Sequence, residues 1–222
     1  SSESALNVVL VGREDAIMAR TSNRQRPLVE MNLSYALVFA VLLGALSMFI
    51  LAYWINVLTA VLKFLSLVGY AVVYTMYLKR ATPQNIVIGG AAGAAPPILG
   101  WTALTGTLDP NALLLFLIIF IWTPPHFWAL AIHRREEYAK VDIPMLPVTH
   151  GEAYTRLNIL LYTILLVLVT VMPYLIGMSG LIYLLVALVL GARYLWFAIR
   201  MYREPDEHEL PMQSFKFSIS YL

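Results

Sequence analysis

The sequence contains no cysteine and little charge. Only 13% of its 222 residues are charged, whereas 60% are hydrophobic; a soluble domain usually has about 25% charged residues. Without cysteine there are no disulfides, iron–sulfur clusters or thiolate zinc sites. The low charge is what a lipid-facing surface requires, because a charged side chain at the bilayer centre costs at least ~2.5 kcal/mol. With a net charge of only +2, the composition indicates an integral membrane protein and no nucleic-acid partner.

The chain also lacks an initiator methionine and a signal peptide. It begins with Ser1, and Ser1–Arg20 has neither a basic start nor a continuous apolar core. We therefore expect the sequence to be a fragment or a processed product.

Long apolar runs dominate the remainder of the chain. Crossing the hydrocarbon layer takes roughly 20 residues, and six segments qualify. The last two come from one uncharged run, 157–192, which is too long for a single helix and which Pro173, Gly177, Ser179 and Gly180 divide by a hairpin turn. The predicted segments are Leu33–Ile55, Val57–Leu78, Asn85–Gly106, Asn111–Ile132 and the two halves of the divided run, the second of which ends near Met201.

The basic residues outside these segments occur in every second connection along the chain. They cluster before the first segment, after the second, between the fourth and fifth, and after the sixth, whereas the intervening turns contain only Asp109 among charged residues. By the positive-inside rule the charged loops are cytoplasmic. Six segments then place both ends of the chain inside.

The loop after the second segment combines cations with a helix start. Lys79 and Arg80 end one helix, and Thr82 and Asn85 begin the next. Cations beside a helix N-terminus form an anion site, because unpaired N–H groups and the helix dipole both favour phosphate. Three glycines then open one face of the new helix, either for close packing or for a bulky flat ligand: Gly89, Gly90 and Gly93. The alternative is that the cations only set topology and the glycines only pack helices.

The fourth segment contains an ionisable residue at membrane depth. Pro124 and Pro125 should kink this helix and free backbone carbonyls, and His126 follows directly. An intramembrane histidine is a functional candidate by default. The alternative is a neutral histidine bonded to a freed carbonyl.

The end of the fourth segment places cations beside carboxylates. Arg134 and Arg135 precede Glu136 and Glu137. Carboxylates that face a cavity at the membrane surface can hold Mg²⁺, which prefers oxygen ligands and substrate phosphates. The alternative is a solvated helix end with ordinary ion pairs. The remaining histidines, His133, His150 and His208, are expected at the surface without a role.

The polar loops resemble those of a known enzyme family. The strings YTMYLKRATPQNIVIGGAAGAAPP and WTPPHFWALAIHRREEY, with IPMLPV after the second, are similar to the signature loops of the protohaem IX farnesyltransferases, within the UbiA superfamily of intramembrane prenyltransferases. The resemblance runs from about Asn7 to the last residue. It implies an all-α, polytopic bundle of nine spans in a bacterial-type inner membrane. It also implies Mg²⁺ between two acidic motifs, and transfer of a farnesyl group from farnesyl diphosphate to a vinyl group of haem b, giving haem O.

Two departures from the family pattern concern the first acidic motif and the extent of the chain. Asn7 and Asp15 match that motif, but Val11 stands where its first Asp belongs, and two extra residues lie between Thr21 and Pro27. Val11 cannot bind a metal, so either Glu14 compensates or the motif is damaged. The six segments correspond to family helices three to eight. Residues 1–222 are therefore expected to be one domain that lacks the first two helices and the last, because the chain stops at FKFSISYL, where a final helix would begin.

The resemblance also implies roles for individual residues. Lys79, Arg80 and His126 would be catalytic, with His126 orienting haem or ligating its iron. Metal ligands would be Asn7, Asp15, Glu136 and Glu137. The diphosphate would be bound by Arg20, Arg26, Lys79, Arg80, Thr82, Asn85, Arg134 and Arg135.

Three other functions remain open at this point. A related prenyltransferase could act on an aromatic or quinone precursor, which the haem-type second loop disfavours. A small transporter would use the kinked fourth helix and the Gly-rich third helix as a pathway and predicts an internal repeat, but Pro124-Pro125 has no counterpart in the other half. A non-catalytic membrane fragment would bind no farnesyl diphosphate.

Overall fold

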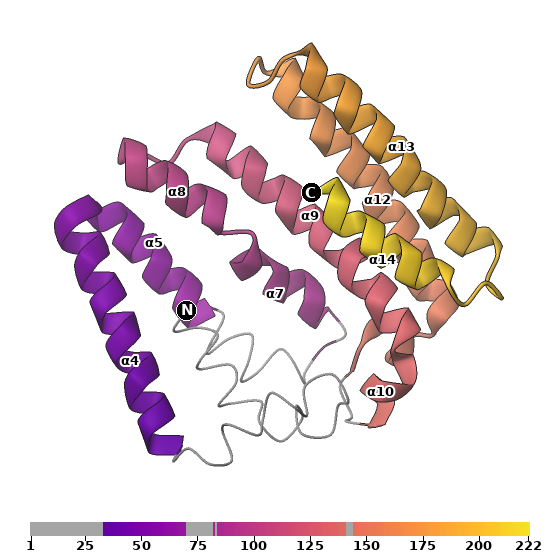
Figure 1. The fold of residues 1–222 in the computed structure, drawn as a ribbon, viewed down its shortest axis with the longest axis horizontal. Coiled ribbons are helices and arrows are strands. Elements are labelled where there is room, and N and C mark those ends of the chain that lie inside the picture. Colours follow the sequence, from indigo (N-terminus) through magenta and orange to yellow (C-terminus); the bar gives the residue numbers. More distant parts are fainter. Residues whose placement is uncertain (1–32, 70–81, 83, 141–143) are drawn as a thin grey trace.

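A computed structural model of the chain describes residues 33–69, 82, 84–140 and 144–222, in which all regular structure is helical. Figure 1 shows the long helices side by side, with α9 in the middle of the bundle. The predicted all-α membrane bundle is thereby confirmed. The helices are α4 (Leu33–Ile50), the π-helical turn η1 (Leu51–Ile55), α5 (Val57–Val68), α7 (Asn85–Gly93), α8 (Pro96–Thr105), α9 (Pro110–His133), α10 (Arg135–Lys140), α11 (Leu146–Thr149), α12 (Glu152–Leu175), α13 (Leu181–Arg203) and α14 (Leu210–Tyr221).

Within the described residues, five stretches are long and apolar enough to cross a membrane, and they match five of the six predicted segments. The second predicted segment is described only as far as Gly69, where it forms the shorter apolar helix α5. The remainder of that segment lies outside the described residues. The five spans are Val38–Ile55, Asn85–Thr105, Pro110–His133, Glu152–Leu175 and Leu181–Arg203.

The third predicted segment has the expected ends but is broken in the middle. Helix α7 ends at Gly93, and α8 begins at Pro96. Two prolines in the first turn of α8 explain the break, because proline has no N–H to continue the hydrogen bonds of α7 but is well suited to starting a helix. Helix α8 ends at Thr105 and is followed by Gly106, whose φ of +69° favours glycine.

Helix α9 continues through both of its internal prolines. The predicted kink site at Pro124-Pro125 does not end the helix, which runs unbroken from Pro110 to His133. Asp109 caps its first turn by accepting a hydrogen bond from the Asn111 N–H at 2.7 Å. Near the prolines, the Thr123 hydroxyl donates to the Ile119 carbonyl at 2.8 Å.

The hairpin predicted in the 157–192 run is confirmed, with its turn where the small residues lie. Helix α12 ends at Leu175 and α13 begins at Leu181. Gly177 in the turn has a φ of +75°, a left-handed conformation that glycine adopts without strain. The Tyr183 hydroxyl ties the two helices together by donating to the Thr170 carbonyl at 2.9 Å.

A helix at the C-terminal end completes the described bundle. We expected a final helix to begin in FKFSISYL, but α14 already begins at Leu210, five residues before Phe215. It folds back along α9 (Figure 1), and the Trp122 indole N–H donates to the Ser218 carbonyl at 2.9 Å. The buried core lies around α9, between α12, α13 and α14.

Candidate active site

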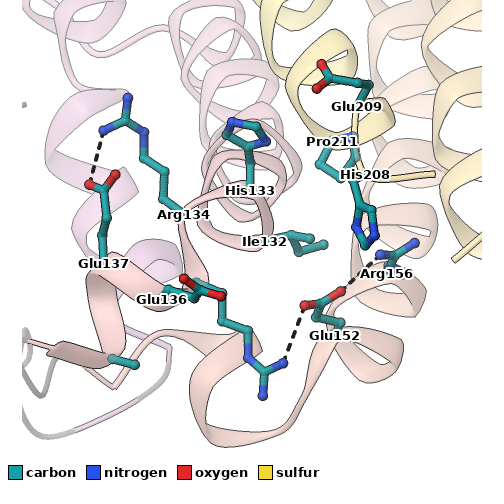
Figure 2. Close-up of a pocket in the computed structure, with 12 residues that line it drawn as sticks. Ile132, His133, Arg134, Glu136, Glu137, Glu152, Arg156, His208, Glu209 and Pro211 are labelled. Carbon is teal, nitrogen blue, oxygen red and sulfur yellow. Dashed lines mark hydrogen bonds and ion pairs between the residues drawn. The ribbon is translucent and has the colours of Figure 1, made fainter. Parts of the chain in front are cut away.

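A polar pocket of about 620 Å³ lies at the C-terminal end of α9, at the end of the bundle predicted to be cytoplasmic. Helix α10, the start of α12 and the connection from α13 to α14 complete it. It contains four residues that the sequence analysis proposed for metal or diphosphate, namely Arg134, Arg135, Glu136 and Glu137. The full lining is Ile132, His133, Arg134, Arg135, Glu136, Glu137, Ala139, Glu152, Arg156, His208, Glu209 and Pro211 (Figure 2).

A chain of ion pairs forms one wall of this pocket. Glu152 accepts from Arg135 at 3.4 Å and from Arg156 at 3.0 Å (Figure 2). The Arg156 side chain is only 4% exposed, and its second guanidinium nitrogen donates to the Met201 carbonyl at 3.0 Å. Because Met201 lies in the last turns of α13, Arg156 ties the start of α12 to the end of α13.

The buried arginine was not recognised from the sequence. Arg156 is one of the basic residues between the fourth and fifth predicted segments, where the sequence pattern indicates only a role in topology. One signal was available: Glu152 lies four residues before Arg156, a spacing at which two side chains on a helix meet. That spacing does not, however, predict burial, which here depends on packing against α13.

The four predicted charged residues in the pocket are not equivalent. Arg134 and Glu137 pair with each other at 3.3 Å (Figure 2), whereas the exposed Glu136 makes no ion pair or hydrogen bond with any residue that the structure describes. The described part of the chain contains no group of three or more His, Asp or Glu side chains that could hold a metal ion. Glu136 is thus suited to be one oxygen ligand of Mg²⁺, but the described residues do not form a complete metal site.

Two histidines and a further glutamate line the pocket without an assigned partner. His133 is the last residue of α9, and His208 and Glu209 lie just before α14. All three are exposed, as expected for the two histidines, and none forms a hydrogen bond, ion pair or ring contact within the described residues. Their position in the pocket was not predicted, because His208 and Glu209 are far from α9 in sequence.

His126 lies away from the pocket, in the contact between α9 and α14. Its side chain is 8% exposed and stacks on Trp122 at 4.2 Å and on Phe215 at 4.6 Å between ring centroids. Its Nδ1 lies 2.6 Å from the Ser218 hydroxyl, which itself donates to the Phe215 carbonyl. Since that hydroxyl has one proton, Nδ1 of His126 is assigned as the donor.

This environment corrects one expectation for His126. The alternative to a functional role was a bond to a carbonyl freed by Pro124-Pro125, but the partner is the Ser218 hydroxyl. The histidine joins α14 to α9. A direct role in haem binding stays a prediction.

The predicted anion loop is described only in part. Thr82 accepts from the Gln84 N–H through its hydroxyl at 3.2 Å, and the Asn85 N–H donates to the Thr82 carbonyl at 3.2 Å. Asn85 is buried, at the start of α7. The other predicted site residues lie outside the described residues: Asn7, Asp15, Arg20, Arg26, Lys79 and Arg80.

Helix α7, which contains Gly89, Gly90 and Gly93, packs closely against α9 at one of these three glycines. A Cβ atom at Gly90 would lie 3.0 Å from the Cγ2 of Thr123, whereas one at Gly93 would meet nothing within 4 Å. Gly89 lines a separate cavity of about 330 Å³ between α5 and α7. One predicted use of these glycines, close helix packing, is therefore found at Gly90, whereas a flat ligand beside α7 stays a prediction.

Comparisons with known proteins identify similar chains. The model of the UbiA prenyltransferase family matches residues 4–220. The protoheme IX farnesyltransferase of Ruthia magnifica is 59% identical over 223 residues, which cover all of this chain and 75% of that protein. The protoheme IX farnesyltransferase of Methylococcus capsulatus is 60% identical over 222 residues, covering all of this chain and 74% of the relative.

A solved structure shares the fold. It comes from a study of digeranylgeranylglyceryl phosphate synthase in membranes, and it matches 99% of this chain and 76% of its own with a TM-score of 0.82 and 18% identity. This chain thus spans about three quarters of the length of the relatives it matches.

Proposed function

The chain belongs to the UbiA prenyltransferase family, and from this premise we propose that it transfers a farnesyl group from farnesyl diphosphate to a vinyl group of protohaem IX, giving haem O. The observation that carries this proposal is identity of 59–60% to protoheme IX farnesyltransferases across the whole chain. The two polar loops, which resemble the haem-specific subfamily, support the same acceptor.

The proposed reaction breaks the C1–O bond of farnesyl diphosphate, the π bond of the vinyl group and one O–H bond of water, and it forms one carbon–carbon and one carbon–oxygen bond. The C1–O bond of farnesyl diphosphate breaks, and its electron pair leaves with the diphosphate. The haem vinyl group supplies the electron pair of the new carbon–carbon bond. Water then adds to the cation left on the former vinyl group and loses a proton to solvent, which gives the hydroxyl group of the product. The walls of apolar helices would shield the allylic cation from premature attack by water.

The leaving diphosphate requires positive charge around it. We propose that Lys79 and Arg80 stabilise its developing charge, because preorganised cations act most strongly where charge appears in the transition state. Thr82 and Asn85 follow this pair in the sequence and would support it at the start of α7. Further cations proposed to hold the diphosphate are Arg20, Arg26, Arg134 and Arg135.

Mg²⁺ is proposed as the cofactor, with Asn7, Asp15, Glu136 and Glu137 as its ligands. Bound there, it would neutralise the oxygens of the diphosphate. Within the described residues Glu136 has no ion pair to break, whereas Glu137 would first have to leave Arg134. Treatment with a chelator should therefore abolish turnover, and added Mg²⁺ should restore it.

The proposed cation role is tested by Lys79→Ala in membranes of cells that make the protein. We expect loss of haem O with the chain still inserted, while Lys140→Ala, at the end of α10, should leave production unchanged. Undiminished haem O from Lys79→Ala would refute the role. Val11→Asp should raise Mg²⁺-dependent turnover; no gain would mean that another residue already compensates.

We further propose that the protein lies in the bacterial inner membrane with its charged loops in the cytoplasm. The absence of cysteine makes single-cysteine labelling unambiguous. Ser179→Cys, in the turn between α12 and α13, should react with a membrane-impermeant maleimide added outside. Glu207→Cys, between α13 and α14, should react only after permeabilisation. The reverse pattern would overturn the orientation.

A further inference from the structure

We propose that Arg156 is a positioning residue for the diphosphate: it holds Glu152 back from Arg135, so that Arg135 stays available to the substrate. This inference rests on the proposed function, in which Arg135 binds the diphosphate of farnesyl diphosphate, and it deepens that function. It gives a role in the same pocket to two residues that the sequence pattern does not single out, Glu152 and Arg156.

The carboxylate of Glu152 is shared between two arginines. Its Oε1 accepts a hydrogen bond from Arg135 at 3.4 Å, and its Oε2 accepts one from Arg156 at 3.0 Å (Figure 2). Arg135 begins α10, whereas Glu152 and Arg156 lie in the first turns of α12. The strength with which Glu152 holds Arg135 therefore depends on how much of its carboxylate Arg156 occupies.

The two arginines differ in how firmly they are fixed. The Arg156 side chain is 4% exposed and that of Arg135 is 49% exposed. Arg156 is also held from the opposite side, because its Nη1 donates to the Met201 carbonyl of α13 at 3.0 Å. Water competes with an exposed ion pair, whereas removing one partner of a buried pair is costly. Arg135 is thus the arginine that can leave Glu152, and Arg156 is the one that stays.

The charge balance of the pocket makes this sharing important for an anionic substrate. Three arginines and four glutamates line the pocket, so its attraction for an anion depends on which carboxylates are already neutralised. Glu137 is paired with Arg134 at 3.3 Å. Glu152 is the carboxylate that lies between two arginines, and it can stay paired with Arg156 when Arg135 turns to the diphosphate.

Loss of Arg156 would reverse this arrangement. Both oxygens of Glu152 would then be open to Arg135, and an arginine–carboxylate pair is strongest when it is bidentate. The diphosphate would have to break this stronger pair and would leave Glu152 as an unpaired carboxylate beside it. Both effects require the negative charge of Glu152, so neutralising Glu152 should cancel them.

The experiment measures the Kd of farnesyl thiodiphosphate with Mg²⁺ by calorimetry, using the purified full chain in detergent. In this analogue a sulfur replaces the oxygen that joins C1 to the diphosphate. Arg156→Gln should raise Kd roughly fivefold, the factor for an exposed ion pair at the upper end of its usual strength. Arg203→Gln is the matched control, because it removes the same charge at the end of α13, outside the pocket, and it should leave Kd unchanged.

The double variant Glu152→Gln/Arg156→Gln separates positioning from other roles. It has the net charge of wild type and no unpaired Glu152, so we expect the wild-type Kd. A direct contact of Arg156 with the diphosphate, or a structural need for its bond to Met201, would keep the double variant weak. If Arg156→Gln does not fold, the double variant is compared with Glu152→Gln, and the two should have the same Kd. A weaker double variant in either comparison, or an unchanged Kd in folded Arg156→Gln, would overturn the proposal.

A second comparison tests whether the effect acts through Arg135. Two changes that act through one interaction are not additive. In an Arg135→Gln background, Arg156→Gln should therefore raise Kd less than it does in wild type. An equal rise in both backgrounds would mean that Arg156 does not act on Arg135, and would refute the positioning role.

Failure of this proposal and failure of the proposed function give different results. If the double variant stays weak while membranes of cells that make the wild-type protein contain farnesylated haem, the role of Arg156 is wrong and the function stands. If Glu152→Gln cancels the effect of Arg156→Gln on Kd but those membranes contain no farnesylated haem, the positioning role stands and the reaction is wrong. Wild-type protein that does not bind the analogue would overturn the positioning role.

Discussion

Substituting Gly90 should destabilise the bundle far more than substituting Gly93, although both lie on α7. At Gly90 a new Cβ would lie 3.0 Å from the Cγ2 and 3.1 Å from the Cβ of Thr123 on α9, closer than carbon atoms normally approach. Thr123 cannot easily rotate away, because its hydroxyl donates to the Ile119 carbonyl at 2.8 Å. Helix α7 or α9 must therefore shift to make room.

The magnitude follows from two opposing contributions. Overpacking a tight contact costs about 1–3 kcal/mol, while replacing glycine by alanine in a helix returns roughly 0.5–1 kcal/mol. Gly90→Ala should therefore destabilise by up to ~2.5 kcal/mol, and Gly90→Val by more. Gly93→Ala meets no atom within 4 Å, so it keeps only the favourable contribution and should be neutral or slightly stabilising.

Thermal unfolding of the detergent-solubilised protein measures both variants. For a chain of this size, ~1 kcal/mol corresponds to about 2–4 °C in Tm, so the two alanine variants should differ by several degrees. Thr123→Ser removes the nearest atom and should recover part of the loss in Gly90→Ala. Equal Tm values for Gly90→Ala and Gly93→Ala would refute the close approach of α7 to α9.

Three further predictions concern polar contacts. Glu152→Gln leaves the buried Arg156 without its carboxylate and should destabilise by about 1–3 kcal/mol in thermal unfolding; an unchanged Tm would contradict the burial of this charge. Ser218→Ala removes the hydrogen-bond partner of His126 and should lower the free energy of unfolding by about 1–3 kcal/mol. We expect faster proteolysis of α14 in this variant; an unchanged rate would contradict a stabilising role of the His126–Ser218 hydrogen bond between α9 and α14. Arg200 donates to Glu204 and so lowers the pKa of that carboxyl from 4.5. This stabilisation exists above pH 4.5 and is lost as the pH falls through the lowered pKa, so wild type and Glu204→Gln should differ in Tm at neutral pH and converge in acid.

Much of the bundle could be predicted from sequence because the bilayer acts on each segment separately. A run without charge, such as 157–192, must be buried in lipid or protein wherever its neighbours lie, and its turn is marked by Gly177 and nearby small residues. Helix α14 was placed too late because it is short and contains Lys216. Its position depends on contacts of Ser218 with Trp122 and His126, which no local pattern reveals.

The candidate site likewise contains some residues that could be predicted from the sequence and others that could not. Arg134, Arg135, Glu136 and Glu137 are adjacent in sequence, so their common location was predictable. The additional members of the pocket come from the start of α12 and the connection to α14, and only the packing of these helices against α9 brings them together. They are Glu152, Arg156, His208 and Glu209.

The most direct test of the central claim is a mass spectrum of haem extracted from membranes of cells that lack their own haem farnesyltransferase and make this protein. We expect a new haem whose mass exceeds that of haem b by one farnesyl group plus a hydroxyl, absent from the same cells carrying Lys79→Ala. Unmodified haem b alone, with the protein inserted and farnesyl diphosphate present, would contradict the proposed reaction. A prenylated aromatic compound in its place would show that the family assignment is right and the acceptor wrong.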